Sequence, residues 1–321
     1  MKKLIVVSAL ALLQTSLFAA TGEVTLSGST WTGKVDGTTK YTGSDMFAAA
    51  NACIAAMSSG TVNLRNSGNS GSSGGAVKSI TLKSSITFNG NGCTITGNSG
   101  DDLIVPIYCK RGSSVAVQNL NIAGRVRYGI WLETCSGMNI QNCNFNGSCL
   151  CPAFRFDNAY GAGSSLTIGT VSAKNGTASQ SMGVETYGIN GINIGTVNAN
   201  NMGGCGLLLN TSGDGWTVGT VNGTDCCVGG GYAGFRCANN NGTGNISFVN
   251  SQHCGRGFFS CTQSHGAVVA KCNAANCTDI GIWIQDGPNT IVNSGTETAN
   301  AGGCWAITGS SSGAAVHVKC Q

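Results

Sequence analysis

A short repeat constrains this chain more than any other feature, recurring roughly every 22 to 28 residues from about residue 115 to the C-terminus. Each unit has a strand of the type Ile-Gly-Thr-Val, a polar turn, a second short strand, and a strand led by glycine. Three copies of the first strand are nearly identical, at Ile168–Val171, Ile194–Val197 and Val218–Val221. One such unit cannot bury its apolar face alone, but stacked units can. The sequence therefore predicts a solenoid.

The repeat predicts strands rather than helices, because apolar residues alternate with variable ones. Glycine makes up 50 of the 321 residues, and no 3.6-residue apolar stripe persists through the repeats, so helix is disfavoured there. The glycine-led strand occurs in eight copies, which predict eight regular coils: Gly129–Glu133, Ala153–Asp157, Gly183–Tyr187, Gly206–Asn210, Gly234–Ala238, Gly257–Cys261, Gly281–Gln285 and Cys304–Thr308.

The N-terminal part predicts less regular coils and one helix. Short β-branched runs at residues 61–64, 80–82, 86–88 and 93–96 are typical of strands. The helix is predicted over about residues 44–57, where Ser44 can cap it and Asp45 suits its first turn. Its apolar stripe consists of Phe47, Ile54 and Met57. Such a helix would cover the open N-terminal end of the stack.

Taken together, this repeat and the segment that follows the helix, Ile80-Thr-Leu-Lys83 and then Ile86 to Gly92, resemble the parallel β-helix superfamily of pectate lyases and polygalacturonases. The resemblance implies an all-β fold, a single-stranded right-handed parallel β-helix with an N-terminal capping helix. It implies one domain over residues 21–321, with regular coils over about 115–320. It also implies a polysaccharide as the substrate.

The catalytic segments of those families are not present, so no catalytic residue is carried over from them. Pectate lyases have Trp-Ile-Asp-His and Arg-x-Pro-x-x-Arg segments, and polygalacturonases have Asn-Thr-Asp, Asp-Asp, Gly-His-Gly and Arg-Ile-Lys segments. Ser264-His265-Gly266 partly matches the Gly-His-Gly segment. We interpret His265 as a turn residue. One fold hosts many chemistries, so candidate site residues must come from the geometry of the predicted coils.

Residues 1–20 predict a secretory signal peptide, with Lys2 and Lys3 before the apolar run Leu4–Leu13 and small residues at Ala19 and Ala20. The apolar run is short for a bilayer, so we expect a secreted protein with no membrane partner. The formal charge is +4 and no basic run occurs, which gives no support for nucleic-acid binding. We expect a monomer.

All 17 cysteines follow the predicted signal peptide, a density that is typical of an oxidising compartment. Successive coils of a β-helix lie about 4.8 Å apart, so bridges between neighbouring coils are plausible, although their connectivity cannot be deduced. We therefore expect a disulfide-rich chain in which the odd count leaves one thiol over.

Alternation along the glycine-led strands predicts which side chains point out of the coil. Two inward columns are predicted, one from Ile130 to Trp305 and the other from Leu132 to Ile307. The first outward column is Trp131, Arg155, Glu185, Leu208, Arg236, Phe259, Trp283 and Ala306. The second is Glu133, Asp157, Tyr187, Asn210, Ala238, Cys261, Gln285 and Thr308.

This outward face combines aromatic rings, acids and arginines, which suits a groove for an acidic polysaccharide. Aromatic faces stack on sugar rings, and guanidinium groups bind carboxylates. The predicted substrate-binding residues are Trp131, Arg155, Asn210, Phe259, Trp283 and Gln285. The alternative is that the aromatics pack under loops and that Arg155 and Glu185 form a merely structural ion pair.

The acids of this face allow two kinds of chemistry. Glu133 and Asp157 share a column on adjacent coils, with β-carbons about 5 Å apart, which suits either a Ca²⁺ site or a proton-sharing pair. No other cofactor is expected. Asp157 and Glu185 lie diagonally at about 8 Å, a separation typical of an inverting glycosidase.

Three functions remain open. In a polysaccharide lyase, a base such as Arg236, Arg155 or Tyr187 removes the proton next to a uronate carboxylate, and Ca²⁺ or arginine neutralises the developing charge. In a glycoside hydrolase, Asp157 and Glu185 act as acid and base. In the third, a secreted protein binds glycan without catalysis. The arginines favour the lyase, with Glu185, Asp157, Arg236 and Tyr187 as the predicted catalytic residues.

Overall fold

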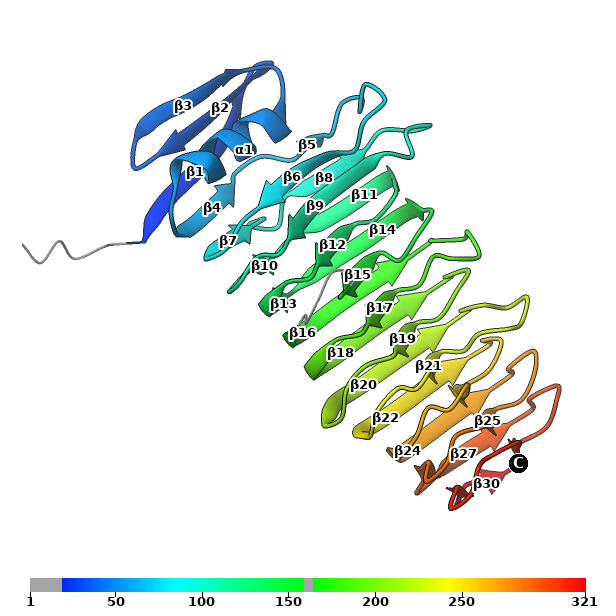
Figure 1. Cartoon of the computed structure of the whole chain (residues 1–321). Helices are drawn as coiled ribbons and strands as arrows, with labels where there is room; N and C mark the ends of the chain where they lie inside the picture. The colour runs from blue at the N-terminus through cyan, green and yellow to red at the C-terminus, as the bar shows by residue number, and fades with distance from the viewer. Residues whose placement is uncertain (1–18, 159–163) are drawn as a thin grey trace, which may run out of the picture.

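The computed structural model describes residues 19–158 and 164–321, which form a parallel β-helix of about 11 turns (Figure 1). The prediction of the fold class is therefore confirmed. The predicted signal peptide lies almost entirely outside the described residues and stays a prediction. All pairings between successive coils are parallel, and the strands belong to two sheets, one of ten strands and one of twenty.

The ten-stranded sheet runs the length of the solenoid on one side. From β12 onward its strands are the predicted glycine-led strands, with ends that differ by one residue. The strands are β6 (Lys78–Leu82), β9 (Ile104–Lys110), β12 (Ile130–Glu133), β15 (Phe154–Asp157), β17 (Val184–Tyr187), β19 (Leu207–Asn210), β21 (Phe235–Ala238), β23 (Phe258–Ser260), β25 (Ile282–Gln285) and β28 (Trp305–Thr308).

The twenty-stranded sheet covers the remaining sides. Its strands are β1 (Ala20–Ser27), β2 (Thr30–Val35), β3 (Thr38–Gly43), β4 (Gly60–Leu64), β5 (Gly68–Asn69), β7 (Ile86–Asn89), β8 (Thr94–Gly97), β10 (Ala116–Gln118), β11 (Asn121–Val126), β13 (Ser136–Gln141), β14 (Cys143–Cys149), β16 (Ser164–Lys174), β18 (Asn190–Asn200), β20 (Trp216–Thr224), β22 (Gly244–Gln252), β24 (Ala267–Ala275), β26 (Ile291–Val292), β27 (Gly295–Thr298), β29 (Ala315–Val316) and β30 (Lys319–Cys320). Strand β16 pairs with both β13 and β14. The three Ile-Gly-Thr-Val-type copies therefore lie in β16, β18 and β20, where two strands of an earlier coil have become one.

The helix α1 (Met46–Ala56) lies at the N-terminal end, as predicted, but Asp45 rather than Ser44 caps it. Asp45 Oδ1 accepts hydrogen bonds from the backbone N–H groups of Phe47 at 2.8 Å and Ala48 at 3.2 Å. Residues 20–43 form an antiparallel β1–β2–β3 unit that sequence reasoning did not assign, and α1 packs against it. Within the described chain, no helix has the length and apolarity of a membrane span.

Six of the eight predicted third strands are led by a glycine that lies in close contact with a neighbouring coil, and Ala153 and Cys304 take its place in the other two. A β-carbon on Gly183 would lie 2.5 Å from the carbonyl oxygen of Gly206, and one on Gly206 would lie 2.6 Å from that of Gly234. These separations are below ordinary van der Waals contact, so a side chain there would push successive coils apart. The repeated glycine therefore sets how tightly the sheet turns into the next coil.

The interior follows the predicted register. Both inward columns are fully buried from Ile130 and Leu132 as far as Ile282 and Ile284. Burying one such side chain contributes about 1.5–3 kcal/mol, so the stacked columns supply much of the driving force for folding. Trp305 is the exception: we predicted it to be inside, but it is 45% exposed. It lies in the last coil, where no following coil covers it.

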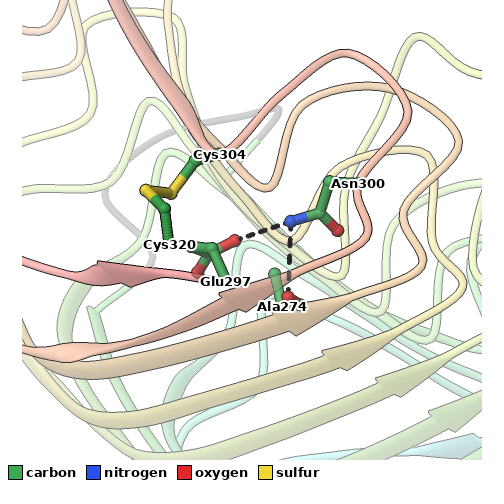
Figure 2. Close-up of a disulfide and its surroundings, with 5 residues drawn as sticks. All are labelled: Ala274, Glu297, Asn300, Cys304 and Cys320. Atoms are coloured by element: carbon green, nitrogen blue, oxygen red, sulfur yellow. Dashed lines mark hydrogen bonds between the residues drawn. A yellow bond between two sulfur atoms is a disulfide. The ribbon is translucent and has the colours of Figure 1, made fainter.

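The cysteines differ from the prediction of a disulfide-rich chain. One disulfide joins Cys304 to Cys320, with the two Cα atoms 5.8 Å apart, and the other 15 cysteines are free (Figure 2). Thirteen of these 15 are buried, where a thiol packs as a small apolar group. The single bridge ties the end of the chain to the start of β28.

Candidate functional site

The outward side of the ten-stranded sheet, which we call the charged face, brings the predicted site residues together. Trp131 is the Cα partner of Arg155, and Arg155 is the partner of Glu185. In the next column Asp157, Tyr187 and Asn210 are successive partners on β15, β17 and β19. The same register continues to Arg236, Phe259, Trp283 and Gln285. The predicted register of the two columns is therefore confirmed within the strands, whereas Cys261 lies just beyond the end of β23.

Much of the charged face is nevertheless covered. The acids Glu133, Asp157 and Glu185 are only 3%, 4% and 7% exposed, and Leu208 and Phe259 are also buried. Leu208 and Phe259 belong to a second apolar cluster outside the sheet, to which the loops before the strands contribute Met182, Cys205 and Ala233. For these two residues the alternative of packing under loops is correct. The prediction of a solvent-facing position is wrong for Leu208 and Phe259 and also for Glu133, Asp157, Glu185, Asn210, Ala238 and Cys261, all of which are buried. Among the predicted catalytic residues, Tyr187 is 41% exposed.

Arg155 is the centre of a buried polar network. Its Nε donates to Asp157 Oδ2 at 3.1 Å, and its Nη1 forms an ion pair with Glu185 Oε2. Burial alone would lower the pKa of the Arg155 guanidinium, but the charges and hydrogen bonds of Glu185 and Asp157 raise it above its ordinary value. One guanidinium thus holds both of the acids predicted to act as acid and base.

Each of these two acids has a further donor. Trp131 Nε1 donates to Asp157 Oδ2 at 2.8 Å, and Asn210 Nδ2 donates to Glu185 Oε1 at 3.3 Å. The carboxylates are therefore engaged by protein groups before any ligand arrives. Such satisfied networks hold side chains in fixed positions.

Glu133 belongs to a neighbouring network. Tyr108 donates its hydroxyl to Glu133 Oε2 at 2.5 Å, and Lys110 Nζ lies 3.3 Å from Glu133 Oε1. Burial, together with the hydrogen bond to Glu133 and the charge of that residue, raises the pKa of Tyr108. Sequence reasoning missed Tyr108 and Lys110, because they belong to an early coil that lacks the regular repeat.

Glu133 and Asp157 are Cα partners, as predicted for a possible Ca²⁺ site. Their contacts differ, because Lys110 and Tyr108 engage Glu133 whereas Arg155 and Trp131 engage Asp157. Within residues 19–158 and 164–321 no group of three or more His, Cys, Asp or Glu side chains is arranged to hold a metal. Binding of Ca²⁺ at this pair stays a prediction.

Aromatic rings gather at two places on the charged face. In the first cluster, Trp131 stacks on Tyr128 with ring centroids 4.7 Å apart and contacts Tyr108 at 4.9 Å. In the second, Phe259 and Trp283 stack at 5.3 Å. Such rings are typical platforms for the apolar faces of sugars.

Two members of these clusters were missed because they stand outside the alternating strands. Tyr128 and Arg256 each come directly before the repeat glycine, at Gly129 and Gly257. The guanidinium of Arg256 lies 4.4 Å from the Phe259 centroid and 4.6 Å from the Trp283 centroid, and it pairs with Asp279 at 2.9 Å. The position before each repeat glycine is thus a signal that could have identified both residues.

Arg236 differs from the other arginines of the charged face. Its guanidinium lies 5.1 Å from the Tyr232 ring centroid and 5.2 Å from that of Phe259, and its Nε donates to Cys261 Sγ at 3.2 Å. Among the described residues no carboxylate forms an ion pair with it. The side chain is half-buried. It is therefore a partly desolvated cation whose charge no acid compensates.

A hollow of about 560 Å³ lies at the N-terminal end, away from the charged face. Trp31, Asp45 and Lys78 are among the residues that line it. Asp45 caps α1 and pairs with Lys78 at 2.8 Å, so these polar groups already have structural partners. We therefore keep the charged face as the candidate site, because cations, acids and aromatic rings converge there.

Comparison with known proteins gives little beyond the fold. No protein-family model matches the chain, and no curated protein matches it. Among solved structures, the A-module of mannuronan C-5 epimerase AlgE4 from Azotobacter vinelandii is similar at a TM-score of 0.39 and 14% identity, covering 87% of this chain and 94% of that one. The A-module of AlgE6 from the same organism has a TM-score of 0.35 and 12% identity, with coverage of 87% and 96%. At these values the likeness carries no weight for the site or the reaction.

Proposed function

We propose that the charged face binds an acidic, uronate-containing polysaccharide and that the chain is a lyase that cleaves it by β-elimination. The observation that supports an acidic ligand is the environment of Arg236. A half-buried guanidinium with no carboxylate partner is favourably placed for an anion, because its desolvation cost is already met and its charge is not compensated. Arg155 and Arg256, in contrast, are each paired with acids.

The two aromatic clusters support a polymer rather than a single sugar. Phe259 is buried, so the ring faces that a sugar reaches are those of Trp131 on β12 and Trp283 on β25, six strand steps apart in the ten-stranded sheet. At about 4.8 Å per step these two rings are about 29 Å apart along the solenoid. A glycan lying across the strands would meet rings at both ends and would pass Arg155, Tyr187 and Arg236 between them.

The reaction requires a base, a cation beside the substrate carboxylate, and a leaving sugar. Tyr187 is the exposed candidate base, and its ring lies 5.4 Å from the Arg155 guanidinium. The base takes the proton next to the carboxylate, the resulting electron pair forms a carbon–carbon double bond, and the bond to the leaving oxygen breaks. The leaving oxygen takes up a proton from water and departs as a sugar hydroxyl. Arg236 or Arg155 would neutralise the charge that develops on the carboxylate.

In this proposal Asp157 and Glu185 position Arg155 rather than acting as acid and base. An inverting hydrolase needs one carboxyl to protonate the leaving group and the other to activate water. Both carboxylates contact the same guanidinium and are nearly inaccessible, which favours elimination over hydrolysis. A binding protein without activity would share the face but would release no product.

The substitution Arg236→Gln tests the ligand class. We expect binding of polygalacturonate, alginate or glucuronan to weaken by at least about tenfold, since a charge-assisted hydrogen bond contributes about 1.5–3 kcal/mol. The matched control is Arg125→Gln, which removes an arginine that pairs with Asp102 away from the charged face. Affinity is measured by calorimetry with and without added Ca²⁺. Equal affinities of wild type and Arg236→Gln would contradict the proposal.

The substitution Tyr187→Phe tests the reaction. We expect it to lower kcat by at least about 100-fold, as for loss of a general base, with ligand affinity retained. The readout is the ultraviolet absorbance of the unsaturated uronate product, and Tyr41→Phe at the N-terminal end serves as the control. New reducing ends without that absorbance would establish a hydrolase instead, and binding without any product would establish a glycan-binding protein.

A further inference from the structure

Four of the free cysteines stand apart from the others, because they form two pairs between neighbouring coils. The thiols of Cys109 and Cys135 interact electrostatically with each other, and so do those of Cys226 and Cys254. All four side chains are buried in the core of the solenoid. Cys143, by comparison, donates to the carbonyls of Val117 and Gln141.

Cys226 and Cys254 occupy equivalent positions in successive coils. Each follows its strand by two residues, and the last residues of those strands, Thr224 and Gln252, are Cα partners. Each thiol also donates to the carbonyl two residues before it, at 3.5 Å and 3.6 Å. Equivalent positions in adjacent coils are about 4.8 Å apart, which lies within the Cα separation that a disulfide spans.

Cys109 and Cys135 meet across a corner of the solenoid. Cys135 Sγ lies 3.6 Å from the carbonyl oxygen of Cys109, and it accepts a hydrogen bond from the backbone N–H of Gly112 at 3.3 Å. A β-carbon on Gly112 would lie 2.5 Å from Cys109 Sγ and 3.7 Å from Cys135 Sγ. The glycine thus leaves the space that both sulfur atoms occupy.

We propose that Cys109–Cys135 and Cys226–Cys254 are two coil-to-coil disulfide sites. Each bridge forms by thiol–disulfide exchange with a low-molecular-weight disulfide such as oxidised glutathione. One thiolate attacks that disulfide and releases a thiol. The second cysteine then displaces the remaining partner as a second thiol. Two cysteine S–H bonds are lost, one S–S bond forms, and the oxidant is reduced to two thiols.

The exchange takes place during folding, before the coils close. Both thiols of the Cys226–Cys254 pair are buried in the core, so a dissolved oxidant does not reach them once the coils have closed. Cys277 occupies the equivalent position in the next coil, because it follows β24 by two residues as Cys254 follows β22. Since Cys254 contacts Cys226 through its thiol, we assign the bridge to that pair and leave Cys277 as a thiol.

Counting thiols tests the proposal directly. The reduced, denatured chain is refolded in a glutathione redox buffer, unfolded again without reductant, and alkylated. We expect eleven labels, which is the 15 free cysteines less the four in the two bridges. Recovery of the two cross-linked peptides by mass spectrometry would confirm each pairing. Fifteen labels would overturn the proposal, and thirteen would retain only the pair whose cross-linked peptide is recovered.

Variants separate the pairing from effects on folding. In Cys254→Ser we expect Cys226 to become labelled, whereas Cys143→Ser should lose its own label and leave both bridges intact. If Cys254→Ser fails to fold, the cross-linked peptides of the wild type still decide the question. Labelling of Cys226 in the refolded wild type would contradict its pairing.

Discussion

Replacing Arg155 with glutamine is expected to lower the free energy of unfolding by about 3 kcal/mol, because it leaves two buried carboxylates without their cation. Asp157 and Glu185 are 4% and 7% exposed, and Arg155 forms ion pairs with both. Hydrogen bonds from Trp131 and Asn210 to the two carboxylates remain. These donors are neutral, so they do not compensate the negative charges. Chemical denaturation of the wild type and of Arg155→Gln measures the difference.

Two controls distinguish the loss of charge compensation from loss of packing. Arg125→Gln breaks an ion pair with Asp102 whose side chains are 39% and 44% exposed, so it should cost less than about 1 kcal/mol. A triple variant that adds Asp157→Asn and Glu185→Gln to Arg155→Gln removes the uncompensated charges and should recover most of the lost stability. If Arg155→Gln is as stable as Arg125→Gln, then Arg155 does not compensate the buried charges of Asp157 and Glu185 as described.

Raising the pH from about 5 to about 8 is expected to destabilise the C-terminal coils through Glu297. Burial raises the pKa of Glu297 to about 8 from an ordinary 4.5, although hydrogen bonds from Asn300 and Cys272 act in the opposite direction. Its Oε2 accepts from Asn300 Nδ2 at 3.0 Å, and its buried Oε1 has no hydrogen-bond partner among the described residues (Figure 2).

The sign of the effect follows from which state holds the proton. Between the two pKa values the folded protein keeps Glu297 protonated, whereas the unfolded chain has released that proton. The stabilisation that Glu297 contributes is therefore greatest near or below pH 4.5 and falls by up to about 1.4 kcal/mol per pH unit until about pH 8. Above that pH, both states are ionised and the contribution of this group no longer changes.

The substitution Glu297→Gln should remove this pH dependence, because the amide does not titrate in this range. Denaturation is measured at several pH values, and Glu23→Gln, which changes a partly exposed acid paired with Arg65, serves as the control. The hydrogen-exchange protection factors of β27 and β28, which are corrected for the intrinsic pH dependence of exchange, should fall as the pH rises in the wild type and in Glu23→Gln but not in Glu297→Gln. An unchanged slope in Glu297→Gln would show that another group is responsible.

The regular coils could be predicted because their signal is local. Inward Ile130 and Leu132 alternate with outward Trp131 and Glu133, and the repeat glycine marks where each strand starts. The β1–β3 unit has no repeat, so no local pattern predicted it. For the same reason Tyr108 was missed, although it lies next to Trp131.

By itself, the sequence determined the stacking of coils and which side chains share a column, because period-2 alternation and one glycine per unit leave a single register. Only the tertiary structure decided how exposed those columns are and which charges meet. Loops from other coils bury Phe259, and Tyr108 and Lys110 from an earlier coil contact Glu133. Such contacts depend on the path of each loop between strands and on side-chain reach across coils, which no local pattern specifies.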